Sequence, residues 1–238
     1  MIRAAIVAGA LLLWFWTQRL LGRRPPPEGT VGDRVHAWTA GLHARLLAHP
    51  RAADGTLIAS SLLIDVIGLS LVAAALLGPT FRPFLALLVV FSLRQACQAL
   101  CALPAPPGMI WRDPGFPTLL VTYKVGNDFF FSGHTAIAVL GALEAARAGP
   151  PWLAVAAGAV AVLEAGAVLV LRAHWTMDVL AGILAAVLGN ALAARAAPHL
   201  PQRLGAHAVL QLDAVELQGG QQVEQPGAIV DLLRIINA

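Results

Sequence analysis

Charged residues are scarce in this chain: they make up 12% of its 238 residues, whereas an ordinary soluble domain has about 25%. Apolar residues make up 58%, and the mean hydropathy is +0.73. A water-soluble globule of this length could not bury so much apolar surface, and a disordered chain would be far more polar. The composition therefore predicts an integral membrane protein that crosses the bilayer several times.

Two further shortages narrow the function classes. The chain has two cysteines, Cys97 and Cys101, and their place in an apolar stretch is typical of packing residues, not of a disulfide framework. The formal net charge is +3, which is too small and too dispersed for a surface that binds nucleic acid. We therefore expect membrane lipids, and no nucleic acid, as partners.

Six segments approach the roughly 20 apolar residues that a helix needs to cross the hydrocarbon core. They cover residues 2–21, 56–77, 83–103, 129–146, 152–171 and 175–197. We expect an all-α fold, a polytopic bundle of six transmembrane helices. Its parts are a first transmembrane anchor (1–21), a basic interfacial linker (22–54), a catalytic transmembrane core (55–197) and a polar C-terminal tail (198–238).

The linker contains a short amphipathic pattern. Four apolar residues share one helical face: Val35, Trp38, Leu42 and Leu46. This spacing predicts a helix that lies on the membrane surface. Three histidines of the same stretch are expected to face solvent: His36, His43 and His49.

The six spans also determine which polar residues can meet. With six crossings, the first, third and fifth loops lie on one side of the membrane and both termini lie on the other. Two clusters of polar residues stand at the beginnings of the fourth and sixth spans, next to the third and fifth loops. Chemistry that uses both clusters would therefore take place at one face of the protein.

Three residues of these clusters are the candidate catalytic groups. His174 and Asp178 are four residues apart, so on a helix they lie on one face, about one turn from each other. A carboxylate in that position can accept a proton from one imidazole nitrogen, which fixes the tautomer and leaves the other nitrogen as a nucleophile or base. His134, from the other cluster, would supply a second titrating group.

The neighbouring residues suit a bound phosphate. Ser132 and Gly133 lie at a predicted helix start, where unpaired N–H groups and the helix dipole favour an anion. The glycine would also let a ligand approach the backbone closely. Three cations complete the candidate substrate site: Arg94, Lys124 and Arg172. Arg94 lies inside a membrane span, where an arginine is costly unless it faces a polar cavity or a partner.

Simpler roles exist for each of these residues. Either histidine alone could be a packed or solvated residue, and Arg94 could form a structural ion pair with Asp65. Asp128 could only cap the fourth span. Two histidines and Asp178 could also bind zinc, but the surrounding cations would repel a divalent ion. We therefore expect no metal and no other cofactor.

At these residues the sequence resembles the type 2 phosphatidic acid phosphatase superfamily of six-helix membrane enzymes. Ser132-Gly133-His134 and His174-x-x-x-Asp178 are similar to two of its three signature motifs. The form of the motifs is closer to the lipid phosphotransferase branch. The stretch 126–135 and the stretch 172–178 are similar to motifs of sphingomyelin synthases, with Asp128 as the acidic residue four positions before the serine.

The same stretches resemble plant phosphatidylcholine:diacylglycerol cholinephosphotransferases, which share Val-Gly-Asn before a Phe-rich Ser-Gly-His. The segment from Leu93-Arg94 to the proline-rich residues 103–108 is similar to the arginine-to-proline segment of both enzyme families. Phe131 stands where the phosphatases usually have proline, and Val168 where they carry an arginine. These departures favour the transferases over the phosphatases.

The resemblance implies transfer of a phospho-head group, such as phosphocholine, between lipid alcohols through a phosphohistidine. His174 would be the nucleophile, Asp178 would orient it, and His134 would act as acid and base. Asp128, Ser132 and the cations would contact the substrate. A lipid phosphatase that uses water, and a lipid transporter or lipid-binding protein, are the alternatives.

The side of the membrane that the site faces is left open by the sequence. The first, third and fifth loops hold most of the Lys and Arg residues, which predicts a cytoplasmic site. The resemblance implies the opposite side, toward the periplasm or lumen. Neither the donor head group, nor the acceptor lipid, nor the oligomeric state follows from the sequence.

Overall fold

The computed structural model of the protein describes residues 2–23, 29–121, 123 and 129–199. All regular secondary structure in these residues is helical. The helices are α1 (Ile2–Leu21), α2 (Arg34–Trp38), α3 (Ala40–Ala48), α4 (Pro50–Leu77), α5 (Arg82–Leu100), α6 (Gly133–Ala148), α7 (Pro151–Val170) and α8 (Thr176–Ala196). A single 3-10 turn, Ala197–His199, follows α8.

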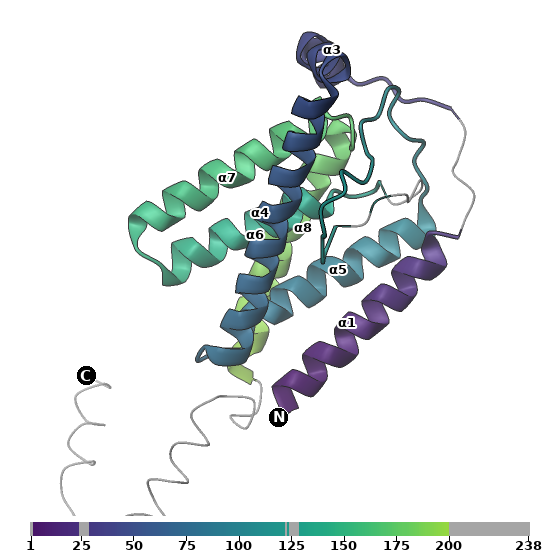
Figure 1. The fold of residues 1–238 in the computed structure, drawn as a ribbon. Coiled ribbons are helices and arrows are strands. Elements are labelled where there is room, and N and C mark those ends of the chain that lie inside the picture. Colours follow the sequence, from purple (N-terminus) through teal and green to yellow (C-terminus); the bar gives the residue numbers. More distant parts are fainter. Residues whose placement is uncertain (1, 24–28, 122, 124–128, 200–238) are drawn as a thin grey trace, which may run out of the picture.

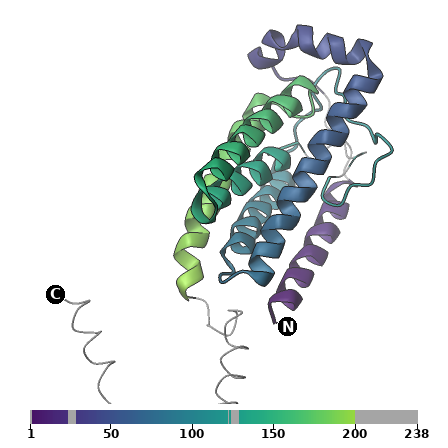
Figure 2. The same cartoon turned by 60° about the vertical axis from the view of Figure 1, so that its left-hand side comes forward.

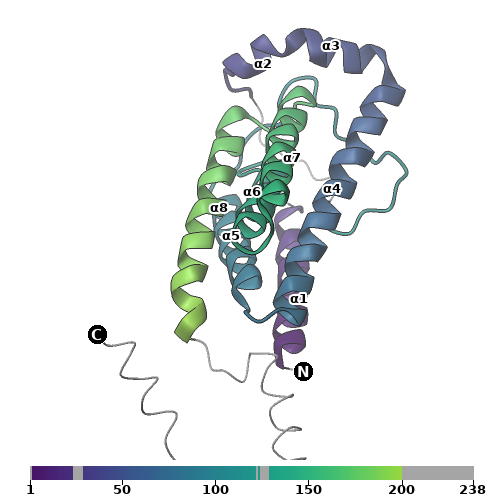
Figure 3. The same ribbon diagram turned by 90° about the vertical axis from the view of Figure 1, so that its left-hand side faces the viewer.

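The long helices pack side by side in one bundle, and α2 and α3 lie across one end of it (Figures 1, 2 and 3). Helices α4, α6 and α8 all begin at that end, because each is preceded by a helix or loop that returns the chain there. The long connection from α5 to α6 lies at the same end. The expected convergence of the two polar clusters is thus compatible with the observed chain path.

The helix bounds differ from the predicted spans in ways that local chemistry explains. Helix α4 begins six residues before the predicted span, because Pro50 occupies its first turn, where a missing N–H is harmless. Helix α6 begins four residues late, because Ser132 caps it and residues 129–131 approach it as non-helical chain. With 16 residues, it is shorter than the roughly 20 that a crossing requires.

Four helices of the described residues are long and apolar enough to cross a membrane: α4, α5, α7 and α8. Helix α1 is not among them, and Arg3, Gln18 and Arg19 near its ends lower its hydropathy. The all-helical fold and several spans are therefore confirmed, while the count of six is not. The predicted tail lies outside the described residues from position 200 onward.

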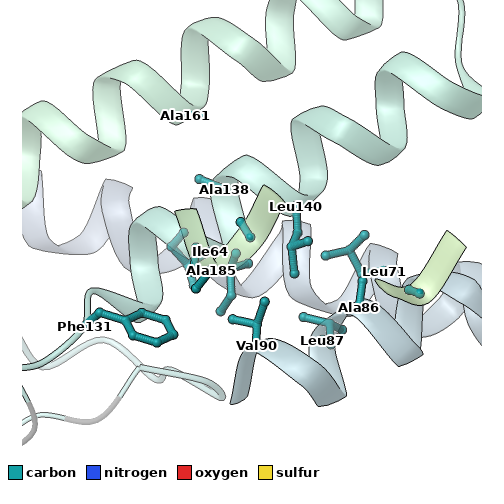
Figure 4. Packing of buried hydrophobic residues seen from close by; sticks show 14 of the residues in the cluster. Ile64, Leu71, Ala86, Leu87, Val90, Phe131, Ala138, Leu140, Ala161 and Ala185 are labelled. Atoms are coloured by element: carbon teal, nitrogen blue, oxygen red, sulfur yellow. The ribbon is translucent and has the colours of Figure 1, made fainter. Parts of the chain in front are cut away.

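Small residues let the central helices approach closely. A side chain at Gly182 of α8 would come within 2.7 Å of the Ser132 carbonyl oxygen, and one at Gly189 within 3.1 Å of the Ala86 carbonyl oxygen. The core beside these contacts is mostly aliphatic, with the Phe131 ring at one side of it (Figure 4), and it includes Val90 and Ile64. Tight helix contacts of this kind are typical of membrane bundles. They hold the start of α6 against α8.

The prediction that the three histidines of the surface helices face solvent is wrong for two of them. His36 and His43, expected to face solvent, are buried with 4% and 5% of their surface exposed, whereas His49 is exposed. His43 Nδ1 lies 2.8 Å from the carbonyl oxygen of Val170, the last residue of α7. Because terminal carbonyls have no partner inside their own helix, the buried imidazole satisfies this one. Trp38 remains exposed, as an interfacial helix requires.

Candidate functional site

The start of α6 is determined by its own first residues. Ser132 is the N-cap, and its Oγ accepts hydrogen bonds from the Thr135 N–H (3.3 Å) and the Thr135 hydroxyl (3.0 Å). Both side chains are completely buried. An N-cap of this kind satisfies one of the free N–H groups of the first turn. It fixes His134, two residues after the cap, within that turn.

The start of α8 is held by a carboxylate. Helix α7 ends at Val170, and the chain turns through Arg172, whose φ of 54° lies in the left-handed region. After that turn the Trp175 N–H donates to Asp178 Oδ2 at 2.8 Å. His174 therefore lies immediately before the helix, and Asp178 lies in its first turn.

One hydrogen bond joins the two helix starts. The Ser132 N–H donates to the Asp178 carbonyl oxygen at 3.0 Å. His134 and His174 consequently line the same cavity, of about 40 Å³, together with Arg94 and Gly133. Its other walls are apolar and aromatic, apart from Gln18: Trp14, Gln18, Ile64, Phe91, Trp111, Leu120, Val121, Phe129, Ile137 and Ala173.

The two rings meet aromatic neighbours and keep nitrogens without partners. His134 packs edge-on against Trp111 at 5.3 Å between ring centroids, and His174 against Phe129 at 6.3 Å. His134 Nε2 and His174 Nδ1 are buried and have no hydrogen-bond partner in the described part of the chain. Unsatisfied buried polar atoms are rare in proteins, and a catalytic role is one of the explanations for them.

Asp178 is placed to act on His174. Its Oδ2 lies 3.5 Å from His174 Nδ1, which is close enough for an ion pair but longer than a hydrogen bond. Its Oδ1 is buried and has no partner among the described residues. Such contacts often tighten only when substrate is bound. The carboxylate can therefore receive a proton or stabilise a positive charge on the ring.

Arg94 lies where the α6 backbone opens into the cavity. Its Nε donates to the Phe131 carbonyl oxygen at 2.9 Å. A side chain at Gly133 would lie 3.4 Å from the same nitrogen, so the glycine lets the guanidinium approach the helix start. The alternative ion pair with Asp65 does not form between these two described residues, and the two Asp65 oxygens instead accept the N–H groups of Leu119 and Leu120 at 2.9 Å each.

The other candidate substrate residues are placed differently. The Arg172 guanidinium donates to the carbonyls of Pro107 (3.1 Å) and His36 (3.5 Å), and it does not line the cavity. Ser132 lies beside the cavity, but both its N–H and its hydroxyl are engaged within the protein. Lys124 and Asp128 lie outside the described residues.

Two residues at the site were not identified from the sequence. His36 Nε2 lies 3.0 Å from the His174 carbonyl oxygen, and the His36 ring stacks on Trp175 at 5.3 Å. Asp33 caps α2 and also receives the N–H and the hydroxyl of Thr176, at 2.7 and 2.8 Å. The name "α2 clamp" is used below for Asp33 and His36. The sequence signal that could have identified Asp33 is its place two residues before the amphipathic pattern that starts at Val35, a position where Asp often caps a helix.

Electrostatics at the clamp follow from these bonds. Burial alone would raise the pKa of Asp33, but the hydrogen bonds from Thr176 and His36 outweigh burial and hold the pKa below its ordinary value. Asp33 is therefore ionised at neutral pH. A carboxylate next to the first turn of α8 also matches the positive end of the helix dipole.

No group of three His, Cys, Asp or Glu side chains with the geometry of a metal site occurs within the described ranges. Comparison with known proteins gives one result. The family model AtPDCT1/2, of phosphatidylcholine:diacylglycerol cholinephosphotransferases, matches residues 33–195, well over half of the chain. No curated protein and no solved structure matches.

Proposed function

Because the chain belongs to the AtPDCT1/2 family of lipid cholinephosphotransferases, we propose that it moves phosphocholine from phosphatidylcholine to a diacylglycerol through a phosphohistidine. The observation that carries this proposal is the shared cavity. Two imidazoles from different helices and one guanidinium line it, and a carboxylate stands behind one imidazole. In-line displacement at one phosphorus needs a nucleophile, an acid–base group and a positive charge in this arrangement.

In the first step His174 attacks the phosphorus of phosphatidylcholine. Its Nδ1 side is directed to Asp178 at 3.5 Å, so Nε2 is the nucleophile. A nitrogen–phosphorus bond forms and the bond from phosphorus to the glycerol oxygen breaks. His134, in its protonated form, gives its proton to that oxygen, and diacylglycerol leaves. Asp178 stabilises the positive charge that develops on the His174 ring.

In the second step the acceptor diacylglycerol occupies the position of the first. His134, now neutral, takes the proton of the acceptor hydroxyl as the oxygen attacks phosphorus. The nitrogen–phosphorus bond breaks and His174 returns to its starting state. The proton is back on His134, so the cycle closes without loss or gain.

The non-reacting phosphoryl oxygens require positive groups in a place that water does not fill. Arg94 and Gly133, at the start of α6, line the histidine cavity, and the first N–H groups of a helix have no partner within that helix. Donors fixed in advance toward developing charge are the largest single contribution in many enzymes. Ser132 and Arg172 contribute by holding the α6 start and the turn before α8, and Lys124 and Asp128 belong to the same candidate site.

The fold proposal goes with this chemistry. We assign the chain to the type 2 phosphatidic acid phosphatase superfamily. In this assignment α1 and the short α6 are added to the four apolar spans α4, α5, α7 and α8 to make six membrane helices. The two motif starts meet through the bond between Ser132 and Asp178, as a shared active site of that superfamily requires. The catalytic core of this proposal covers residues 55–197.

The experiment uses the full chain, purified in detergent and returned to lipid vesicles. The donor is phosphatidylcholine with labelled choline and one set of acyl chains, and the acceptor is diacylglycerol with chains of another length. Transfer yields labelled phosphatidylcholine that carries the acceptor's chains. His174→Ala abolishes this product, and His49→Ala, which removes an exposed histidine bonded to its own helix, leaves it unchanged.

Three outcomes would contradict the proposal. Release of free phosphocholine without acceptor would identify a phosphatase that uses water. Movement of lipid between leaflets without any new lipid species would identify a transporter. Full transfer by His174→Ala would exclude the phosphohistidine.

A further inference from the structure

A second cavity lies beside the first and is almost entirely apolar. It has a volume of about 220 Å³ and lies between α1 on one side and α4 and α5 on the other. Ala10, Leu88 and Val72 are examples of its walls, and we call it the α1 groove. The two cavities share lining residues: Trp14, Phe91, Leu120 and Ile137. The α1 groove therefore adjoins the cavity that holds the two catalytic histidines.

Helix α1 is fixed at both ends and leaves the space in between. Near its start Arg3 donates to the Ala75 and Gly78 carbonyl oxygens at 2.9 and 3.0 Å. Near its end Trp14 packs against Phe91 at 4.9 Å between ring centroids. Gln95 donates to Gln18 at 3.0 Å beside that contact. The groove is thus a gap held open by two anchored ends.

Few polar groups line the groove, and two of their atoms, Trp14 Nε1 and Gln95 Oε1, are buried without a hydrogen-bond partner in the described part of the chain. The Thr17 hydroxyl donates to carbonyls of its own helix, and the Gln95 amide to Gln18. Because nearly all the other lining residues are apolar, the space favours hydrocarbon over water. Leu13 and Leu88 of the wall are 60% and 40% exposed on the outer surface of the bundle. The groove is therefore open toward the surface that faces lipid tails.

We infer that the α1 groove holds one acyl chain of the glycerolipid whose head group occupies the histidine cavity. This inference rests on the proposed function. A glycerolipid must place its phosphorus between polar groups and its chains in hydrocarbon, and the two adjoining cavities offer this pair of environments. Helix α1 forms one wall of the groove. It lies outside the region that matches the family model, because that match begins at residue 33.

Filling the groove tests the inference. Ala10→Phe places a ring in the groove, and Ala8→Phe, the matched control, places it on the exposed surface of the same helix. Ala10→Phe should lower kcat/KM for dioleoyl substrates about tenfold or more, because chain and ring compete for one space. Dihexanoyl substrates, whose chains are too short to fill the groove, should react within about twofold of wild type by the same reasoning.

A second pair of variants repeats the test from α5, in case Ala10→Phe does not fold. Ser92→Phe enters the groove from α5, and Ala96→Phe, one turn later, is its exposed control. Both groove variants should show the same selective loss for long chains. Equal loss for short and long chains, or none for either, would overturn the inference.

Photochemical labelling separates this inference from the proposed function, because it needs no turnover. Phosphatidylcholine with a diazirine in the middle of one acyl chain should label peptides of α1 and α5 in the wild-type protein. Ala10→Phe should lose most of this labelling and Ala8→Phe should keep it. Labelling of those peptides without any transfer would refute the proposed function alone. Transfer with labelling confined to other helices would refute the α1 groove alone.

Discussion

The two helix starts that form the site bring their histidines there by different means. At α6 the cap belongs to the helix itself, because Ser132 bonds to Thr135 three residues later. At α8 the histidine precedes the helix, and its carbonyl is held by His36, 138 residues away. The comparison teaches that His134 is placed by local sequence, while His174 depends on a distant surface helix.

The largest expected effects come from removing either ring. His174→Gln should lower transfer by more than about 10³-fold, because it removes the proposed nucleophile. His134→Gln should lower it by about 10²- to 10⁴-fold, the usual range for an acid–base group. Initial rates with labelled donor measure both. His49→Gln is the control, and a change of similar size there would show that the assay reports general damage.

Asp178→Asn should separate the carboxylate's two tasks. The amide oxygen can still accept the Trp175 N–H, so the start of α8 and the thermal unfolding midpoint should change little. The charge that stabilises the His174 ring is lost, and transfer should fall about 10²-fold or more. Thermal unfolding and initial rates on the same preparation provide the two readouts. Loss of stability in proportion to activity would instead make Asp178 a purely structural cap.

His36→Ala tests the dependence of His174 on the α2 clamp. It frees the His174 carbonyl and removes the stack on Trp175, so kcat should fall about 10- to 100-fold with KM little changed, because small misplacements of a reacting group are costly. His43→Ala is matched to it, since His43 holds the Val170 carbonyl in the same manner.

The His43 variant should lose stability, about 1–3 kcal/mol for an unsatisfied buried carbonyl, and keep kcat. If both histidine variants lowered kcat equally, the surface helices would act only on stability. The ratio of the two kcat values is therefore the quantity that matters.

The smallest effect concerns Asp33. Asp33→Asn replaces one carboxylate oxygen by an NH₂ group. Where this group faces the Thr176 N–H, two donors meet and the hydrogen bond is lost. The substitution should cost about 1 kcal/mol of stability at neutral pH, as the loss of a cap does. The pKa of Asp33 is lower in the folded protein, so its stabilisation is complete above the unfolded pKa of about 3.9. It should disappear as the pH falls through the folded value.

The difference in unfolding free energy between wild type and Asp33→Asn, measured from neutral to acidic pH, checks this sign. Asp54→Asn is the control, because Asp54 forms an exposed ion pair with Arg112 at 2.7 Å. Exposed pairs contribute about 0–1 kcal/mol. A difference for Asp33 that grew toward acidic pH would contradict the assignment.

Much of the site could be predicted from the sequence because its determinants are local. The sequence spacing puts His174 and Asp178 about one turn apart, Ser132 and Gly133 are placed near a helix start, and the order of the spans predicts that the two clusters lie at one end. The structure places His174 just before α8 instead of on it, and Ser132 as the N-cap of α6. In the structure, the hydrogen bond between the Ser132 N–H and the Asp178 carbonyl oxygen joins the two clusters at that end. Composition and the lengths of the apolar segments predict an all-helical membrane protein, which is confirmed, whereas the predicted count of six spans is not.

The remainder depended on contacts between distant residues. His36 and His43 carry the pattern of a solvated surface helix, yet they are buried because carbonyls of the α7–α8 turn need donors. Arg172 is close to His174 in sequence, but its left-handed turn directs the guanidinium to two backbone carbonyls instead of the cavity. Sequence periodicity cannot predict these contacts, because they join residues that are far apart along the chain.

The most direct test is to trap the intermediate. The full-length protein is mixed with choline-labelled phosphatidylcholine in the absence of diacylglycerol, quenched in alkali and digested, and the labelled peptide is sequenced by mass spectrometry. We expect an acid-labile phosphocholine on His174 that diacylglycerol removes and that His174→Gln lacks. Label on another residue, or transfer without any label on the protein, would contradict it.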